Sequence, residues 1–317
     1  MERKAQPLII IAGPTATGKT ELSLSLAQKF STRGGPAFGW NGVEILAVDS
    51  MTVYRDMDIG TAKATKEEQK VVPHHLLDIL DPDEEFNIAI FKPLAKKIIK
   101  KIWHKSKIPF LVGGSALYLD CLVYDYRIPE AKPDLKLRKE LEQKSNKELM
   151  KQLTELDPDA VWTIDPNNKR RIIRALEVCL VTGKPFSRQK AKSKFSQKTL
   201  YLAIEVARDI LYERINERVD KMMDEGFLKE VKKLYKKYDH KTSMQAAGYK
   251  ELIEHIEGKI TLKEAVEKTK QVHRNFAKRQ LTWFKKNKDI IWLPFDPNNL
   301  EKTKQEAEKI IINFLKN

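Results

Sequence analysis

The chain has 317 residues, 41% of them hydrophobic, which is enough for one large α/β domain and a smaller second one, each with its own core. A formal net charge of +15 favours a polyanionic partner such as nucleic acid, an anionic membrane surface or a phosphorylated substrate. The two cysteines, Cys121 and Cys179, are not in C-x-x-C spacing, which disfavours a disulfide or zinc framework and favours a reducing compartment.

We expect a cytoplasmic protein with no membrane association. No apolar run in the sequence approaches the roughly 20 residues that cross a bilayer. Residues 1–4 lead directly into the first predicted strand, so we expect no signal peptide.

The first predicted element is an apolar strand over residues 8–12, which leads into the pattern G-x-x-x-x-G-K-T and then into a predicted helix. Gly13 and Gly18 permit a backbone that turns several N–H groups toward one point, and the helix N-terminus adds its dipole. Lys19 supplies a positive charge to the outer phosphates, and the Thr20 hydroxyl supplies a ligand for Mg²⁺. The alternative is a glycine turn that binds nothing. The predicted diphosphate-binding residues are Gly13, Pro14, Thr15, Ala16, Thr17, Gly18, Lys19 and Thr20.

Residues 31–42 are rich in glycine and are predicted to form a surface loop, to which we assign no function. A second strand over residues 43–48 follows and ends at Asp49. Ligands collect at the carboxyl ends of strands in open α/β sheets, so Asp49 is directed toward the same crevice as the phosphate loop. His74 and His75 are predicted to serve turn or packing roles and not to bind a metal, since adjacent side chains diverge.

A helix over residues 86–107 and a third strand over residues 108–112 come next. The strand runs into Gly113 and Gly114, which indicates a close approach of the backbone to another group. Ser115 is the first hydroxyl beyond this pair.

The pattern of predicted elements changes over residues 129–198, where charged helices replace the alternation of strands and helices. We predict an inserted all-helical subdomain here, with one helix opening at Arg170 and an exposed connection over residues 189–198. The α/β domain then comprises residues 1–128 and 199–317.

A strand over residues 200–206 returns the chain to the sheet, and the helix after it carries Arg214 and Arg218 four residues apart on one face. Two like charges at this spacing suit a bound phosphate. The alternative is a solvated face neutralised by Glu213 and Glu217.

The last long helix, roughly residues 262–286, interleaves basic and aromatic side chains. Such a helix can follow a nucleic-acid backbone and stack on bases. The alternative is a helix whose aromatic side chains pack in the core and whose basic side chains face water.

A phosphate loop alone indicates an NTP-binding kinase or ATPase. Three features argue against that reading here. Asp49 is followed by Ser50 and a Tyr54/Arg55 pair, no second strand ends in an acidic Mg²⁺ ligand, and basic and aromatic residues dominate the insert and the last helix.

The motifs together resemble the tRNA dimethylallyltransferase family, in the family's order and over almost the whole chain. The departures are Thr52 in place of Gln or Leu, Ser115-Ala116 in place of Thr-Gly, and a longer loop over residues 31–42. No C-terminal zinc finger of the eukaryotic type is expected, which implies a bacterial-type enzyme. The matching blocks are residues 13–20, 49–55, 58–63, 73–82, 113–118, 170–177, 245–252 and 278–284.

The resemblance implies an α/β fold of the P-loop NTPase type that transfers a dimethylallyl group from dimethylallyl diphosphate to N6 of the adenosine 3′ of the anticodon, A37, in tRNAs reading codons that begin with U. Asp49 is the implied general base. The leaving diphosphate is neutralised by the loop, by Lys19, by Mg²⁺ on Thr20, and by Arg214 and Arg218.

The resemblance also implies that the target adenine is flipped out of its stack and that Ser115 contacts the target nucleotide. We expect a monomer that binds tRNA and no membrane. The residues implied to contact tRNA are Asp49, Ser50, Met51, Thr52, Arg170, Arg171, Ile172, Ile173, Arg174, Lys278, Arg279 and Gln280.

Two other functions compete with this reading. A small-molecule kinase or an adenylate isopentenyltransferase would act on ATP or free AMP and bind no tRNA. A nucleic-acid-binding ATPase would ignore dimethylallyl diphosphate. The basic insert and last helix argue against the first, and Asp49 with its neighbours against the second.

Overall fold

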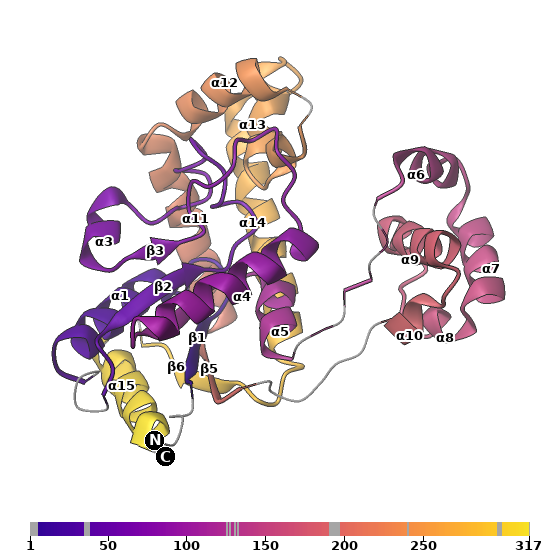
Figure 1. Cartoon of the computed structure of the whole chain (residues 1–317). Coiled ribbons are helices and arrows are strands. Elements are labelled where there is room, and N and C mark those ends of the chain that lie inside the picture. The colour runs from indigo at the N-terminus through magenta and orange to yellow at the C-terminus, as the bar shows by residue number, and fades with distance from the viewer. Residues whose placement is uncertain are drawn as a thin grey trace. The chain divides into compact units, whose positions relative to one another are not determined.

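The chain forms two compact units in a computed structural model (Figure 1). One comprises Met1–Val123 and Gln197–Asn317, and the other Tyr124–Ser196, whereas the sequence suggested divisions at 128/129 and 198/199. Most of the predicted connection over residues 189–198 lies outside the described residues, as does the middle of the glycine-rich loop. The structure describes residues 6–34, 39–124, 126, 128, 129, 131, 133–189, 197–239, 241–296 and 300–316.

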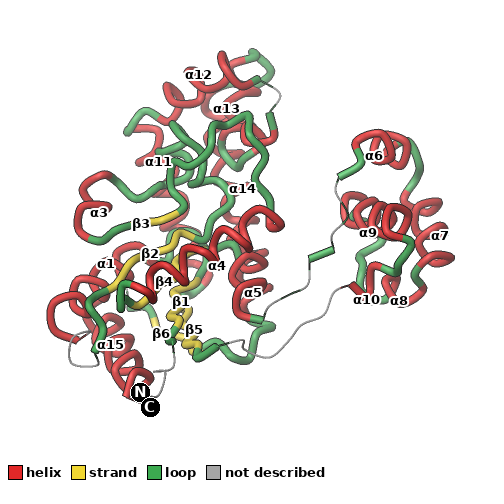
Figure 2. The backbone as a smooth tube through the Cα atoms, in the orientation of Figure 1, coloured by secondary structure: helices red, strands yellow, loops and turns green. Residues whose placement is uncertain are grey.

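The first unit is built on a six-stranded sheet in the order β3-β2-β4-β1-β5-β6, and every pairing in it is parallel (Figure 2). The central strand β1 is fully buried, as its continuous apolar sequence requires in a sheet covered on both faces. The strands are β1 (Leu8–Ala12), β2 (Val43–Ala47), β3 (His74–His75), β4 (Ile108–Gly113), β5 (Thr199–Glu205) and β6 (Ile291–Pro294).

Helices cover this sheet. Helix α1 packs on β2 and β4 and also against α15, while α4 packs on β2 and β4 and α15 on β5 and β6. Ile9 and Ile11 of β1 share a core cluster with Leu22 and Leu26 of α1, because alternate side chains of a strand point to the same face. The helices are α1 (Lys19–Lys29), α3 (Lys66–Val71), α4 (Ile88–His104), α5 (Ala116–Val123), α11 (Arg208–Asp224), α12 (Phe227–Tyr238), α13 (Tyr249–Ile256), α14 (Leu262–Phe284) and α15 (Leu300–Lys316), with a π-helical turn η1 (Phe30–Gly34) and a 3-10 turn η2 (Thr242–Gln245).

The predicted α/β fold is confirmed, including the strands that became β1, β2, β4 and β5. His74 and His75 form the short strand β3, in which His74 Nδ1 lies 2.7 Å from the Val72 carbonyl and His75 Nε2 2.8 Å from Glu44. In the described part of the chain, no three His, Cys, Asp or Glu side chains are grouped to hold a metal. Nor is any described helix both long and apolar enough to cross a bilayer.

The second unit is all-helical and has its own apolar core. At its centre, Glu177 is fully buried and accepts hydrogen bonds from Arg138 Nε at 2.8 Å, from Arg174 Nη1 and from the Asp134 amide. These partners compensate the burial of the carboxylate and lower the pKa of Glu177. The helices are α6 (Leu135–Glu142), α7 (Asn146–Leu156), α8 (Pro158–Val161), α9 (Lys169–Thr182) and α10 (Phe186–Gln189).

The tRNA contacts implied for Ile172 and Ile173 are wrong. Both side chains lie in the core of the second unit, 0% and 5% exposed, so they offer no surface to RNA. Their neighbours Arg170 and Arg171 are exposed and half-exposed at the start of α9. The helix therefore uses its isoleucines for packing, and Arg174, also predicted to contact tRNA, bonds Glu177 and the Ala131 carbonyl, so Arg170 and Arg171 remain for a partner.

The predicted close approach at the end of β4 is also present. A Cβ added to Gly113 would lie 2.0 Å from the Val48 carbonyl oxygen, and one added to Gly114 would lie 2.2 Å from the amide nitrogen of Gln280. Glycine at position 113 therefore lets the two neighbouring strand ends converge.

We predict that Gly113→Ala lowers the free energy of unfolding by about 3 kcal/mol, because the methyl group cannot fit without moving the backbone of β2. Urea denaturation followed by circular dichroism measures the loss. The matched control is Gly258→Ala, where φ is +73° and no atom lies within 4 Å of the added Cβ. It should cost only the left-handed backbone strain of about 1 kcal/mol. Equal losses in the two variants would contradict the steric explanation.

Candidate active site

The loop between β1 and α1 has the geometry of a phosphate cradle. Gly13, Ala16 and Gly18 adopt positive φ angles of +148°, +64° and +85°, and α1 begins at Lys19 with its first amides facing the loop. Within the loop, the Pro14 carbonyl accepts hydrogen bonds from Lys19 Nζ at 2.6 Å and from Thr17 Oγ1 at 2.9 Å.

Two side chains from later in the sequence hold the outside of this loop. Gln280 of α14 accepts a hydrogen bond from the Thr15 amide at 3.0 Å and donates one to the Gly114 carbonyl at 2.9 Å. Arg214 of α11 donates from Nε to the Ala16 carbonyl at 2.8 Å. The loop is thus tied both to the end of β4 and to α11.

A cavity of about 490 Å³ opens beside the loop at the carboxyl ends of the strands, entirely within the first unit. The phosphate loop forms one part of its wall, the segment after β2 another, and the segments before α13 and along α14 the remainder. The predicted site residues that line it are Thr15, Lys19, Thr20, Asp49, Ser50, Met51, Thr52, Arg218, Arg279 and Gln280.

Among the side chains on the cavity wall are the cations Lys19 and Arg218 and the carboxylate of Asp49. Burial, together with the positive charge of Arg218, lowers the pKa of Lys19 to about 7, against the opposing effect of Asp49. Burial also lowers the pKa of Arg218, again opposed by Asp49. Asp49 accepts a hydrogen bond from the Met51 amide at 2.8 Å, which orients its carboxylate at the end of β2.

Some predicted residues are placed elsewhere. Arg214 is held against the loop carbonyl and stacks on the ring of Phe295, with 4.9 Å from guanidinium carbon to ring centroid, and it is not part of the cavity wall. Ser115 and Lys278 also lie outside that wall. Gln280 lines the cavity, but both ends of its amide are used inside the protein. The RNA contact assigned to it is replaced by a structural role.

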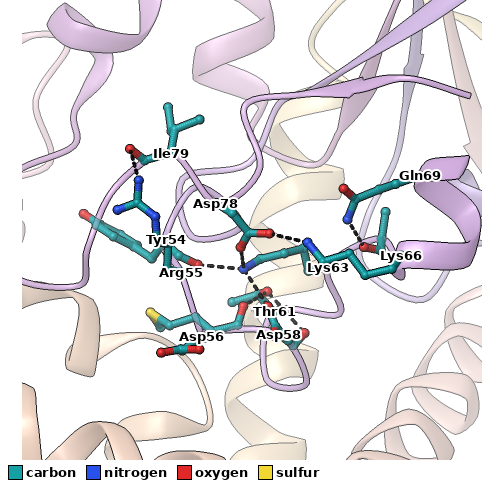
Figure 3. Close-up of polar contacts among 12 residues, drawn as sticks. Tyr54, Arg55, Asp56, Asp58, Thr61, Lys63, Lys66, Gln69, Asp78 and Ile79 are labelled. Atoms are coloured by element: carbon teal, nitrogen blue, oxygen red, sulfur yellow. Dashed lines mark hydrogen bonds and ion pairs between the residues drawn. The ribbon is translucent and has the colours of Figure 1, made fainter.

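The segment after Asp49 is fixed by a buried lysine that sequence reasoning missed (Figure 3). Lys63 donates to the Tyr54 carbonyl at 2.7 Å and to the carboxylates of Asp58 at 2.6 Å and Asp78 at 2.5 Å. Lys66 pairs with the other oxygen of Asp78 at 2.9 Å. The sequence signal was the block of residues 58–63, which matched the family but received no role.

A second missed residue is Glu230 of α12. Its carboxylate accepts hydrogen bonds from the backbone amides of Asp58, Ile59 and Gly60 at 3.0, 2.8 and 3.1 Å, and from the Tyr249 hydroxyl at 2.6 Å. Glu230 thereby joins the segment after Asp49 to the first residue of α13, and Gly60 and Tyr249 both line the cavity.

Thr20 can serve the predicted Mg²⁺ as one ligand of a site whose other ligands come from the substrate and from water. Its side chain is exposed on the cavity wall. Mg²⁺ keeps several waters and is bound through few protein ligands together with substrate phosphates. A single hydroxyl beside the phosphate loop suits an ion whose other ligands come from a diphosphate and from water.

The fold and this site define an α/β protein of the phosphate-loop class whose cavity pairs an anion cradle with a carboxylate. The IPP transferase family model matches residues 52–287. A tRNA dimethylallyltransferase of Staphylococcus saprophyticus is 46% identical over 92% of this chain and 93% of its own length, and that of Bacillus subtilis 42% identical over 94% and 93%.

Solved structures agree with the sequence relatives. The tRNA isopentenylpyrophosphate transferase of Bacillus halodurans is 38% identical, with a TM-score of 0.72 over 98% of this chain and 97% of that chain. A eukaryotic dimethylallyltransferase acting on tRNA is 31% identical, with a TM-score of 0.79 over 96% of this chain and 78% of that one. The chain belongs to the IPP transferase family, and the resemblance noted in the sequence is confirmed.

The lowered pKa of Lys19 predicts that diphosphate binding takes up protons. At about pH 7.5 this amine is partly neutral in the free protein, and a bound anion favours the ammonium form. Affinity for inorganic diphosphate should therefore fall as the pH rises through 7 to 8. Isothermal titration calorimetry in two buffers of different ionisation enthalpy measures the uptake.

Lys19→Met should remove this proton uptake and weaken diphosphate binding, while Lys309→Met, at an exposed position of α15 outside the cavity wall, should change neither. If the uptake is the same in the wild-type and Lys19→Met proteins, the assigned proton carrier is wrong.

Proposed function

We propose that the protein transfers a dimethylallyl group from dimethylallyl diphosphate to N6 of the adenosine 3′ of the anticodon, A37, in tRNAs reading codons that begin with U. The observation that carries the proposal is that the phosphate cradle and Asp49 line one cavity. Membership of the IPP transferase family and the similarity to a eukaryotic dimethylallyltransferase acting on tRNA support the same activity.

The donor's diphosphate occupies the cradle. The loop amides, Lys19 and Arg218 surround it, and the Nε of Arg218 is buried without a hydrogen-bond partner among the described residues. A buried donor left unpaired is costly, so a ligand oxygen is its natural partner. Thr20 would hold Mg²⁺ together with this diphosphate. The ion would supply charge neutralisation to the departing group.

The acceptor adenine enters beside Asp49. Adenine N6 is a weak nucleophile because its lone pair is delocalised into the ring, and a carboxylate within hydrogen-bond reach takes its proton as the new bond forms. Ser50, Met51 and Thr52 follow Asp49 on the cavity wall and form the pocket for the base. The Oγ1 of Thr52 is buried without a partner in the described residues, which leaves it for the base.

The reaction then balances as a single substitution. The bond from the allylic carbon to the diphosphate oxygen breaks, and its electron pair leaves with the diphosphate. The bond from N6 to that carbon forms, and the N6 proton passes to Asp49. Positive charge that develops on the allyl group is matched by the diphosphate, which Lys19 and Arg218 hold in place. The base must leave its stack to reach this point.

The test is incubation with dimethylallyl diphosphate and unmodified tRNA, followed by mass analysis of the nucleosides. Formation of a prenylated adenosine supports the proposal. Phosphate transfer from ATP, prenylation of free AMP, or ATP hydrolysis without prenylation would instead establish one of the competing functions.

Asp49→Asn should lower turnover about 100-fold or more while tRNA binding persists, since the amide keeps the shape of the side chain but cannot take a proton. Single-turnover kinetics with saturating tRNA measures the loss. Asp56→Asn is the matched control, because this exposed aspartate pairs with Lys233 outside the cavity. Retained turnover in Asp49→Asn would place the base elsewhere.

Arg170 and Arg171 are proposed to bind tRNA phosphates. Replacing both with alanine should weaken tRNA binding and reduce the slope of log affinity against log salt by about 1 to 2, because fewer counterions are released. Filter binding over a salt series measures the slope. Lys309→Ala with Lys316→Ala is the control at equal charge change. An unchanged slope in the arginine variant would remove these residues from the RNA interface.

A further inference from the structure

His273 of α14 is a buried side chain that the proposed reaction does not use. It is 6% exposed and lines the main cavity. Its Nε2 atom has no hydrogen-bond partner anywhere in the described part of the chain. Nearly all buried polar atoms in folded proteins are paired, so an orphaned nitrogen on a ligand cavity indicates a partner supplied by the ligand.

The protonation state of the His273 ring determines whether the partner of Nε2 must be a donor or an acceptor. Burial, together with the charge of Arg218, lowers the pKa of His273 to about 4, so the ring is neutral near pH 7. A hydrogen bond to the backbone of Ala247 favours the protonated ring, which means that the carbonyl accepts it. Because Nε2 is unpaired, Nδ1 is the donor in this bond. Nε2 is therefore an acceptor and needs a ligand O–H or N–H.

The position of His273 lies away from the phosphate cradle. Gln280, on the same face of α14, marks the cradle end of the cavity, and His273 is two turns earlier, about 10 Å along the helix axis. That separation is comparable to the reach of a diphosphate plus a short prenyl chain. Val272 and Phe276 flank His273 on the cavity wall, and Ala246 lies on the segment that faces it. These three side chains offer apolar contacts to a prenyl tail beside the unpaired nitrogen.

We propose that Nε2 of His273 accepts a hydrogen bond from a hydroxyl group on the tail of a prenyl donor, so that this protein accepts a hydroxylated allylic diphosphate as well as dimethylallyl diphosphate. The inference rests on the proposed prenyl transfer and defines the donor for that same site. The diphosphate has no proton to offer, and a plain dimethylallyl tail has no polar hydrogen. A tail hydroxyl satisfies both the apolar wall and the unpaired nitrogen.

The chemical step is unchanged by this hydroxyl. The allylic carbon–oxygen bond to diphosphate breaks, the bond to N6 forms, and the hydroxyl remains on the transferred group. Only binding differs, since a site with a buried acceptor disfavours an analogue that leaves the acceptor unpaired.

The test compares two donors, dimethylallyl diphosphate and 4-hydroxy-3-methylbut-2-enyl diphosphate, with the same unmodified tRNA. The wild-type protein should show a kcat/KM for the hydroxylated donor at least equal to that for the plain donor. His273→Leu removes the acceptor and should lower the ratio of hydroxylated to plain kcat/KM about 10-fold. His273→Gln, which can still accept a hydrogen bond, should restore part of the ratio.

The control is His255→Leu, a histidine of α13 that bonds the Ile260 carbonyl outside the cavity and should leave the ratio unchanged. Strong discrimination of the wild type against the hydroxylated donor overturns the inference, whatever the variants do. So does an equal loss with both donors in His273→Leu, which would assign Nε2 to the adenine or to folding. Failure to prenylate tRNA with either donor would instead reject the proposed function itself.

Discussion

One buried amide holds the catalytic parts of this protein together. The Gln280 side chain accepts a hydrogen bond from the Thr15 amide and donates one to the carbonyl of Gly114, directly after β4. It comes from α14, far along the chain from either partner. Gly114 packs so closely against this amide that a side chain at this position would collide with it. The end of β4, the phosphate loop and α14 therefore meet at Gln280. The geometry of the cradle therefore depends on the last long helix as much as on the loop itself.

The cradle is electrostatically incomplete without an anion. Burial lowers the pKa of both Lys19 and Arg218, Arg218 also lowers that of Lys19, and Asp49 opposes both shifts without cancelling them. In the proposed reaction a diphosphate supplies the missing negative charge, while Asp49 acts as the base toward the acceptor.

The sequence alone predicted the parts that depend on local patterns. β-Branched runs indicated β1, β2, β4 and β5, and the glycine spacing indicated the loop. It did not predict β3, because two histidines carry no periodic signal and the strand exists only through its pairing with β2. The RNA contact of Gln280 was implied by the family resemblance, and the basic and aromatic run around it left open which face of the helix is buried. Which face of α14 turns inward is decided by packing, as it is for Ile172 and Ile173 of α9.

The polar groups that hold the scaffold are paired within the protein, whereas several buried polar atoms on the cavity wall have no described partner. On the scaffold side, Lys63 holds the carboxylate of Asp78, a residue with a positive φ angle, and Glu230 holds the backbone amides of residues 58–60. On the cavity side, the buried polar atoms that lack a described partner belong to Thr52, Arg218 and His273. We assign these three atoms to the proposed contacts with the base, the diphosphate and the prenyl tail.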